Sequence, residues 1–343
     1  MRRFYVGLPI TVLALLLITA AYAQTGQLMK TGDPIKRGLK ETDFPRTKTL
    51  APGVYSYEAL RGGDPGSFMT TVSLIVVTTD GVLVADGQGN LEESQKMVDA
   101  IKKMTPQPIK YVVICSDHGD HTAGNAAFKT AFPNVVFISS DVSQKVLANN
   151  ANPSTETVKD KRVMTMGRTE IQILNLGRAH TGGDLSVYVP DGRVLFMSEA
   201  FLHRIFPAMR SAYPTEWLGT IKKAQGMNAT WYVPGHGFVD DSNSLKDELE
   251  VYRKALEYVI AEGKRLHSAK VPCEVPPPAQ RGAGGGGERA GRGGGGGGGR
   301  GQAAPCEAVQ KANWGPYADW TLRGGQAQTA ILKVYEELDG KLK

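Results

Sequence analysis

Cysteine is scarce in this sequence, with three residues among 343. That number excludes a small fold held together by several disulfides, and it excludes an iron–sulfur cluster bound by four thiolates. A large excess of charge of one sign is also lacking, since the formal net charge is +6. Such a mild positive charge does not indicate a dedicated nucleic-acid-binding protein. Histidine is nearly as scarce, with six residues, so the positions of the histidines are informative.

Apolar runs long enough to cross a membrane are lacking everywhere except at the N-terminus. Two arginines precede an apolar run over residues 4–20, and Ala-Tyr-Ala at 21–23 has the small-x-small pattern of a signal peptidase site. The pattern predicts a signal peptide over residues 1–23 and hence a periplasmic or secreted protein with no stable membrane span after cleavage. The alternative is an uncleaved signal anchor, because about 20 apolar residues can span a bilayer.

The rest of the chain has the composition of a folded protein, with 41% hydrophobic and 22% charged residues. Strand pairs followed by alternating strands and helices predict an α/β fold whose helices cover the faces of a sheet. Strands are expected at 54–57, 70–78, 82–86, 111–115, 135–139, 171–176, 185–189, 194–197 and 231–233, and helices at 91–104, 123–130, 142–149 and 215–225. We expect an irregular lead-in over 24–50, a main domain over 51–240 and further segments beyond it.

Beyond residue 240 we expect an amphipathic helix over 241–270, capped by Ser242 or Ser244. A flexible loop over 271–310 follows it, and then a C-terminal helix over 311–343 that packs on the domain. The loop is rich in proline and then in glycine and arginine, and residues 281–301 hold 14 of the 41 glycines. Such a tract cannot bury enough apolar surface to offset its ordering entropy. Cys273 and Cys306 flank the tract, and a disulfide between them would fix both ends of the loop in an oxidising compartment.

Polar side chains that bind metals follow several predicted strands at the point where each strand ends. Four of the six histidines are among them, whereas His203 and His267 lie outside the pattern and Cys115 is expected to be an inert core thiol. The residues in question are Ser116-Asp117-His118-Gly119-Asp120-His121, His180, Glu199 and His236. In α/β folds active sites lie at the carboxyl ends of strands, and imidazole and carboxylate are ligands that zinc accepts. The sequence therefore predicts a metal site.

The ordered series His118-x-Asp120-His121, His180, an acidic residue at a strand end and Pro-Gly-His236-Gly resembles the metallo-β-lactamase superfamily. The stretch from His180 to Phe196 is most similar to its glyoxalase-II-like metallohydrolases. The resemblance covers residues 54–239 and makes the domain over 51–240 the catalytic domain. It implies a four-layer αββα sandwich with a site for one or two zinc ions at one edge, and Asp86 falls where the family keeps a supporting aspartate.

Two residues depart from the family motif. The first histidine of His-x-His-x-Asp-His is Ser116 here, and the bridging aspartate of the family is Glu199. The resemblance leaves His118 and His180 as ligands in a weakened first metal site. The second site keeps three ligands, which are Asp120, His121 and His236. Glu199 can reach in as a further ligand. We therefore expect one tightly bound zinc ion and an optional second.

The chemistry implied is metal-assisted hydrolysis of a small-molecule substrate. Zinc lowers the pKa of a bound water from about 15.7 to about 7, which gives a nucleophile that can attack an ester, thioester, lactone or amide carbonyl. Asp120 would orient this water and accept its proton, and His118 would act as general base if the first metal is absent. Cleavage of β-lactams is a narrower hypothesis. The loop over 200–213, with Phe201, His203 and Phe206, either selects the substrate or only packs.

Other classes of function stay open at this point. In a non-catalytic member, Ser116 and Glu199 would mark decay of the metal site, and the fold would serve binding or assembly. An iron-dependent oxidoreductase is disfavoured, because a di-iron centre needs the full ligand set. No nucleic-acid partner is expected of an exported protein, and the sequence does not determine the oligomeric state.

Overall fold

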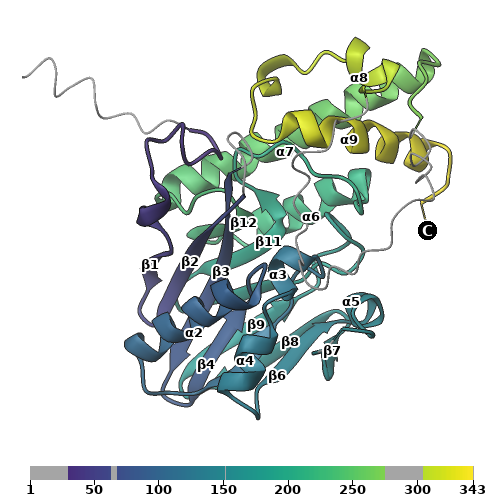
Figure 1. Ribbon diagram of the computed structural model, residues 1–343. Helices are drawn as coiled ribbons and strands as arrows, with labels where there is room; N and C mark the ends of the chain where they lie inside the picture. The colour runs from purple at the N-terminus through teal and green to yellow at the C-terminus, as the bar shows by residue number, and fades with distance from the viewer. Residues whose placement is uncertain (1–29, 63–67, 151, 275–303, 343) are drawn as a thin grey trace, which may run out of the picture. The chain divides into compact units, whose positions relative to one another are not determined.

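The strands form one continuous hydrogen-bonded sheet in the computed structural model, which describes residues 30–62, 68–150, 152–274 and 304–342 (Figure 1). Within these residues the sheet has 12 strands; the order of its main path is β7-β6-β5-β4-β3-β12-β11-β10-β9-β8, and β2 joins β1 to β3. The strands are β1 (Arg46–Ala51), β2 (Val54–Arg61), β3 (Met69–Thr78), β4 (Gly81–Ala85), β5 (Ile109–Val113), β6 (Val136–Ser140), β7 (Glu156–Val158), β8 (Lys161–Met166), β9 (Thr169–Leu174), β10 (Ser186–Val189), β11 (Val194–Leu202) and β12 (Trp231–His236).

The helices belong to the compact unit Thr31–Lys343. They are α2 (Leu91–Met104), α3 (Gly119–Thr122), α4 (Ala126–Ala131), α5 (Asp141–Val146), α6 (Pro214–Gly226), α7 (Ser242–Ser268), α8 (Glu307–Lys311) and α9 (Arg323–Leu338), with 3-10 turns η1 (Glu41–Asp43) and η2 (Gly315–Tyr317). In the part of the chain that the structure describes, no helix has the length and apolarity needed to span a membrane. The predicted signal peptide over 1–23 lies outside the described residues.

The sheet is divided into two halves that meet at a single pairing. Strands β3 and β12 are joined only through Thr71 and His236, whereas β3 pairs with β2 along eight residue pairs. The half made of β1–β7 and the half made of β8–β12 contribute side chains to the same core, such as Leu74 of β3 and Val187 of β10. Because successive side chains on a strand point to opposite faces, Ile75, the neighbour of Leu74, belongs to a second core on the outer face.

Helices cover the outer face of each half (Figure 1). The second core contains Met97 of α2 and Phe128 of α4, which pack on the outer face of the first half. Trp217 of α6, Leu256 of α7 and Ile331 of α9 belong to the first core, the one that also contains Leu74 and Val187. The four-layer αββα arrangement predicted for the α/β fold is confirmed.

Several elements differ from the sequence prediction in the N-terminal half. The predicted irregular lead-in over 24–50 contains η1 and most of β1, which pairs with β2 through a turn in which Gly53 has a φ of 75°. The prediction missed β1 because every residue but Leu50 in its strand is polar or small. It also missed β7 and β8. These strands lie at the two ends of the main path of the sheet, and each buries only one of its residues.

The predicted helices are displaced by a few residues. The helix expected at 123–130 corresponds to α4, which begins at Ala126, and the short helix α3 before it was not predicted. The helix expected at 142–149 begins at Asp141 and ends at Val146. The N-cap of α7 is Asp241, whose side chain accepts a hydrogen bond from the backbone N of Ser244, rather than either predicted serine. Strand β11 runs on to Leu202, so Glu199 lies within the strand instead of after it.

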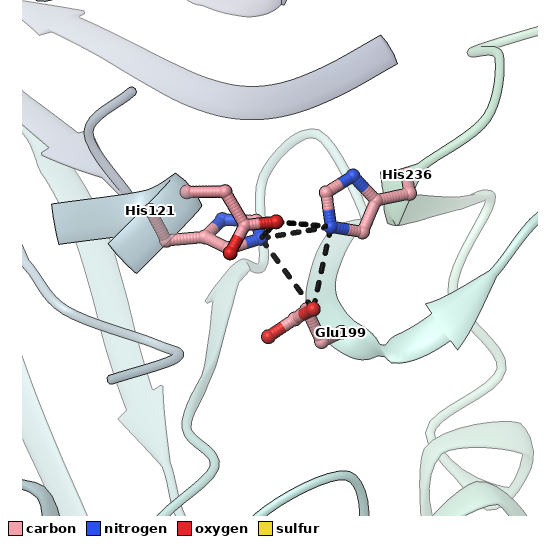
Figure 2. A group of neighbouring side chains, drawn as sticks. His121, Glu199 and His236 are labelled. Carbon is pink, nitrogen blue, oxygen red and sulfur yellow. Dashed lines mark hydrogen bonds and ion pairs between the residues drawn. The ribbon is translucent and has the colours of Figure 1, made fainter. Parts of the chain in front are cut away.

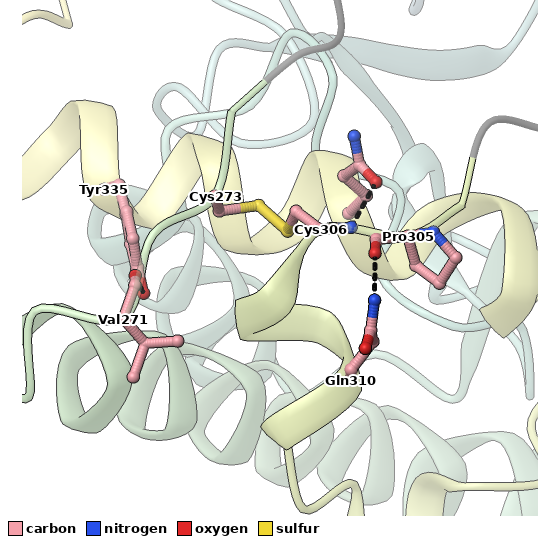
Figure 3. The surroundings of a disulfide bond; sticks show 7 residues. Val271, Cys273, Pro305, Cys306, Gln310 and Tyr335 are labelled. Atoms are coloured by element: carbon pink, nitrogen blue, oxygen red, sulfur yellow. Dashed lines mark hydrogen bonds between the residues drawn. A yellow bond between two sulfur atoms is a disulfide. The ribbon is translucent and has the colours of Figure 1, made fainter.

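The C-terminal segment folds back on α7. Helix α9 begins at Arg323 rather than near the start of the predicted segment 311–343, and α8 begins inside the predicted loop 271–310, whose residues 275–303 lie outside the described part of the chain. Figure 3 shows the disulfide between Cys273 and Cys306, with an S–S distance of 2.07 Å. Close by, the hydroxyl of Tyr335 on α9 donates to the carbonyl of Val271 over 2.9 Å.

We expect the disulfide to stabilise the fold. It links residues that are 33 positions apart, and a loop of that length corresponds to about 3–4 kcal/mol of unfolding free energy in the chain-entropy account. A reductant should therefore lower the melting temperature of the wild-type protein. The double variant Cys273→Ser/Cys306→Ser should melt at the lower temperature with or without reductant. Equal melting temperatures for oxidised and reduced wild-type protein would contradict a stabilising role.

Candidate metal centre

The predicted site residues meet at one edge of the fold, where two pairs of parallel strands end. Strands β4 and β5 are parallel in the first half, and β11 and β12 are parallel in the second. Asp86 directly follows β4, Ser116 and His118 follow β5, Asp120 and His121 lie on α3, His180 lies between β9 and β10, Glu199 lies in β11 and His236 ends β12. The structure brings all six predicted ligands into two donor groups, in each of which the donor atoms lie within 4.8 Å of one another.

The first donor group consists of Asp120, His121, Glu199 and His236. Figure 2 shows His121, His236 and Glu199 pointing toward one another. The Nε2 atoms of His121 and His236 are 3.2 Å apart. His236 Nε2 also lies 3.1 Å from Asp120 Oδ2 and 3.3 Å from Glu199 Oε1. Four donor atoms from three separate segments therefore surround one point.

The second donor group consists of His118, His180 and Glu199, and it corresponds to the weakened first metal site of the sequence analysis. The Nδ1 atom of His118 is 3.1 Å from His180 Nε2 and 2.9 Å from Glu199 Oε2. The other oxygen, Oε1, is 3.1 Å from His180 Nε2. Glu199 is thus shared by the two groups, and it lies between them.

The donor set of the first group fits a zinc ion. Ligand atoms that surround zinc tetrahedrally at about 2.0–2.2 Å lie about 3.3–3.6 Å from one another. Five of the six donor distances in the first group lie between 3.1 Å, from Asp120 to His236, and 3.9 Å, from His121 to either carboxylate. The sixth, from Asp120 to Glu199, is no longer than 4.8 Å. The second group offers three donors, because Ser116 lies where the family motif has a histidine. A serine hydroxyl is a poor zinc ligand at neutral pH, so this group is the weaker of the two.

Charge in the two groups favours a bound cation. Burial raises the pKa of the Glu199 carboxyl, but the surrounding imidazoles lower it by more, and the net pKa lies well below its usual value. Burial lowers the pKa of His236, but the hydrogen bonds that it donates to Asp120 and Glu199 outweigh burial and raise the pKa to about 10. Glu199 likewise outweighs burial at His118 and raises its pKa to about 9. The carboxylates are ionised at neutral pH and attract positive charge.

Asp86 holds the backbone and one ligand in place from behind the site. Its Oδ1 atom accepts hydrogen bonds from the backbone N of Cys115 at 2.7 Å and of Ser116 at 3.3 Å. Its Oδ2 atom accepts a hydrogen bond from the Ser198 hydroxyl and lies 3.0 Å from His121 Nδ1. A carboxylate at the second ring nitrogen fixes the orientation of a metal-binding histidine. Asp86 is therefore placed where it can orient His121, and its role as supporting aspartate stays a prediction.

His236 is oriented in a similar way by the backbone. Its Nδ1 atom is 2.8 Å from the carbonyl of Thr70, to which it donates, so that Nε2 faces the donor group. Gly235 permits β12 to approach β11 closely, because a Cβ atom at this position would lie 2.4 Å from the carbonyl carbon of Ser198. The close approach brings His236 and Glu199 together.

Three other polar residues point away from the site. His203 is buried, with Nδ1 2.8 Å from the carbonyl of Phe238, and His267 pairs with Asp339 at 2.9 Å. Asp117 accepts a hydrogen bond from the Ser143 hydroxyl. All three lie outside both donor groups. The free thiol of Cys115 is buried in the core.

The sequence analysis missed two residues that contact the donor groups. The guanidinium of Arg61, at the end of β2, donates to Asp120 Oδ2, and the Ser211 hydroxyl lies 3.3 Å from His118 Nε2. Neither belongs to a motif, and only the pairing of strands could have placed Arg61 here. For the loop over 200–213 the two interpretations were substrate selection and packing. Phe201 and Phe206 follow the second, because both are fully buried in the core.

Asp86→Asn should weaken metal binding about 10–100-fold, the usual effect of losing a carboxylate that orients a ligand histidine. The substitution removes the charge at His121 Nδ1 while the side chain keeps its size. The measurement is a competition for zinc with a chromophoric chelator. Asp80→Asn is a matched control, because Asp80 is exposed and pairs with Lys110 outside the donor groups. Equal zinc affinity in the two variants would contradict the role given to Asp86.

Comparison with known proteins agrees with this geometry. Residues 66–236 match the family model of the metallo-beta-lactamase superfamily. Metallo-beta-lactamase IND-1 of Chryseobacterium indologenes is 25% identical over 189 residues, which cover 53% of this chain and 78% of that protein. The alpha subunit of a 2,4-dinitroanisole O-demethylase from Nocardioides sp. (strain JS1661) is 22% identical, and the match covers 48% of this chain and 52% of the subunit. The chain therefore spans about half the length of that relative.

The fold is also found among solved structures. A metallo-beta-lactamase from Pontibacter korlensis superposes with a TM-score of 0.56 at 21% sequence identity. The superposition covers 62% of this chain and 98% of the other. Together with the family match and the ligand series at the edge of the sheet, this identifies the chain as a member of the metallo-β-lactamase superfamily.

Proposed function

We propose that this protein is an exported zinc-dependent hydrolase that cleaves an ester, thioester, lactone or amide bond in a small molecule. Membership of the superfamily supports a metal-dependent hydrolase at that level, and the metal, the bond and export are the proposal. The observation that carries it is the pair of buried donor groups that share Glu199. Two imidazoles and two carboxylates in one group form a ligand set that zinc accepts.

The chemistry divides between the metal and the residues around it. Zinc, when bound by the first donor group, supplies a Lewis acid that lowers the pKa of water and polarises a carbonyl. Asp120 offers a carboxylate that can orient a water molecule and accept its proton, and Arg61 fixes that carboxylate from the other side. Of the ligands, His118 has the most exposed side chain, at 15%. Where the second donor group holds no metal, Glu199 raises the pKa of His118 to about 9, so His118 is protonated at neutral pH and can donate a proton there rather than act as the expected base.

The two named relatives show why the substrate class is kept broad. One is named as a β-lactamase and the other as a subunit of an O-demethylase, and the two matches cover 53% and 48% of this chain. A shared fold does not select the bond that is broken. β-Lactams are therefore one member of the amide class to be tested, beside esters, thioesters and lactones.

The test is the zinc content of the mature protein, purified without chelators or added metal and measured by plasma mass spectrometry. We expect about one equivalent of zinc, and up to two at higher zinc concentration, because the second group lacks a fourth strong ligand. His236→Ala should lose the metal, since His236 contacts both carboxylates of the first group. Hydrolysis of a substrate found by screening should stop on chelation and return with zinc.

His267→Ala is the matched control, because His267 pairs with Asp339 away from both donor groups. It should keep the zinc content of the wild-type protein. A wild-type protein that binds no zinc even after equilibration with the metal would overturn the hydrolase. It would favour the non-catalytic alternative, in which Ser116 and Glu199 mark a lost site.

Export is tested by the mass of the protein made from the full chain in a bacterial host. Cleavage after Ala23 should release residues 1–23 and leave Gln24 as the first residue of a periplasmic or secreted product. Ala23→Phe should block cleavage, because signal peptidases need a small residue at this position. An uncleaved chain that remains in the membrane would support the signal-anchor alternative, and an uncleaved chain in the cytoplasm would contradict export.

A further inference from the structure

The hydroxyl of Ser116 contacts the carboxylate that both donor groups share. Ser116 is 0% exposed, and its Oγ atom donates a hydrogen bond to Glu199 Oε2. The same oxygen faces His118 Nδ1 at 2.9 Å. The other oxygen, Oε1, faces His180 Nε2 at 3.1 Å and His236 Nε2 at 3.3 Å. The two oxygens of Glu199 therefore have different neighbours, and the serine is bonded to Oε2.

The position of the serine is itself fixed. Asp86 accepts a hydrogen bond from the backbone N of Ser116, and the backbone N of His118 donates to the serine Oγ at 3.3 Å. Because Oγ accepts from His118, its own proton is directed at Glu199. The hydroxyl is thus held on one side by the backbone of a predicted ligand and on the other side by the shared carboxylate.

The chain combines a small residue at 116 with a long acidic residue at 199, and the two are in contact. A glutamate side chain has more rotatable bonds than an aspartate and loses more entropy when it is fixed in one conformation. A hydrogen bond from a rigid neighbour selects one of these conformations before a ligand arrives. The two departures from the family motif are therefore joined by a hydrogen bond.

We propose that Ser116 is a positioning residue that holds Oε2 of Glu199 beside His118, so that Oε1 faces the first donor group as well as His180. The serine acts through Glu199 and is not a ligand. This inference rests on the proposed function, because it requires that the donor groups bind zinc. It assigns a role to the residue that stands where a ligand is missing.

The test is a double-mutant cycle with Ser116→Ala, Glu199→Ala and the combined variant, in which zinc affinity is measured by chelator competition. Ser116→Ala should weaken zinc binding about 10–100-fold in the presence of Glu199. It should cause little further loss in the Glu199→Ala background, because the group on which the serine acts is gone. The visible spectrum of the cobalt-substituted protein should also change in Ser116→Ala, since the orientation of a ligand changes.

Matched variants separate positioning from folding. Ser139→Ala removes another fully buried serine hydroxyl, which lies 2.6 Å from the Ser154 hydroxyl and outside both donor groups. It should leave zinc affinity unchanged. If Ser116→Ala does not fold, Ser116→Thr and Ser116→Val provide the same comparison, because they have the same shape and only threonine keeps the hydroxyl. Threonine should bind zinc more tightly than valine.

Three results would overturn the inference. Wild-type affinity in Ser116→Ala would show that the hydroxyl does not matter, and the hydrolase proposal would stand. An equal loss with and without Glu199 would show that the serine acts independently, as a ligand or by packing. A wild-type protein that binds no zinc would remove the proposed function, and the positioning role with it.

Discussion

The carboxylate of Glu199 is buried with four imidazole rings around it, and the rest of the site depends on this arrangement. The rings belong to His118, His121, His180 and His236. A buried charge is costly unless opposite charge or hydrogen bonds surround it, and here the imidazoles keep the carboxyl ionised. Two donor groups can lie next to each other because they share this one side chain.

The backbone around the carboxylate is built to bring the rings together. Asp86 and Ser198 both have left-handed conformations, with φ values of 63° and 48°, although neither is glycine. Their side chains are hydrogen-bonded to each other, so the end of β4 in one half is connected to β11 in the other half. Trp217 of α6 packs edge-on against the ring of His180 at 5.4 Å, and its indole N–H donates to the carbonyl of Ala200. The hydrophobic layer thereby supports the polar site directly.

Much of the layered fold could be predicted from the pattern of the chain. The paired strands around Asp80-Gly81, the buried strand before Cys115 and the helix over 91–104 have strong local signals, and the structure contains all of them. The errors fall where local signals are weak. Strand β8 lies at a sheet edge with alternate exposed residues, and β1 is held by its pairing with β2 rather than by its own apolar residues.

By itself the sequence determined the identity and order of the candidate metal ligands, since the residue types and their spacing along the chain depend only on local pattern. Only the tertiary structure decided that Glu199 is shared by two donor groups, that Ser116 donates to it and that Arg61 contacts Asp120. The reason is distance along the chain: Ser116 and Glu199 are 83 residues apart, and Arg61 and Asp120 are 59 apart. Such contacts arise from strand pairing and from the packing of one half of the sheet on the other, which no local pattern of residues records.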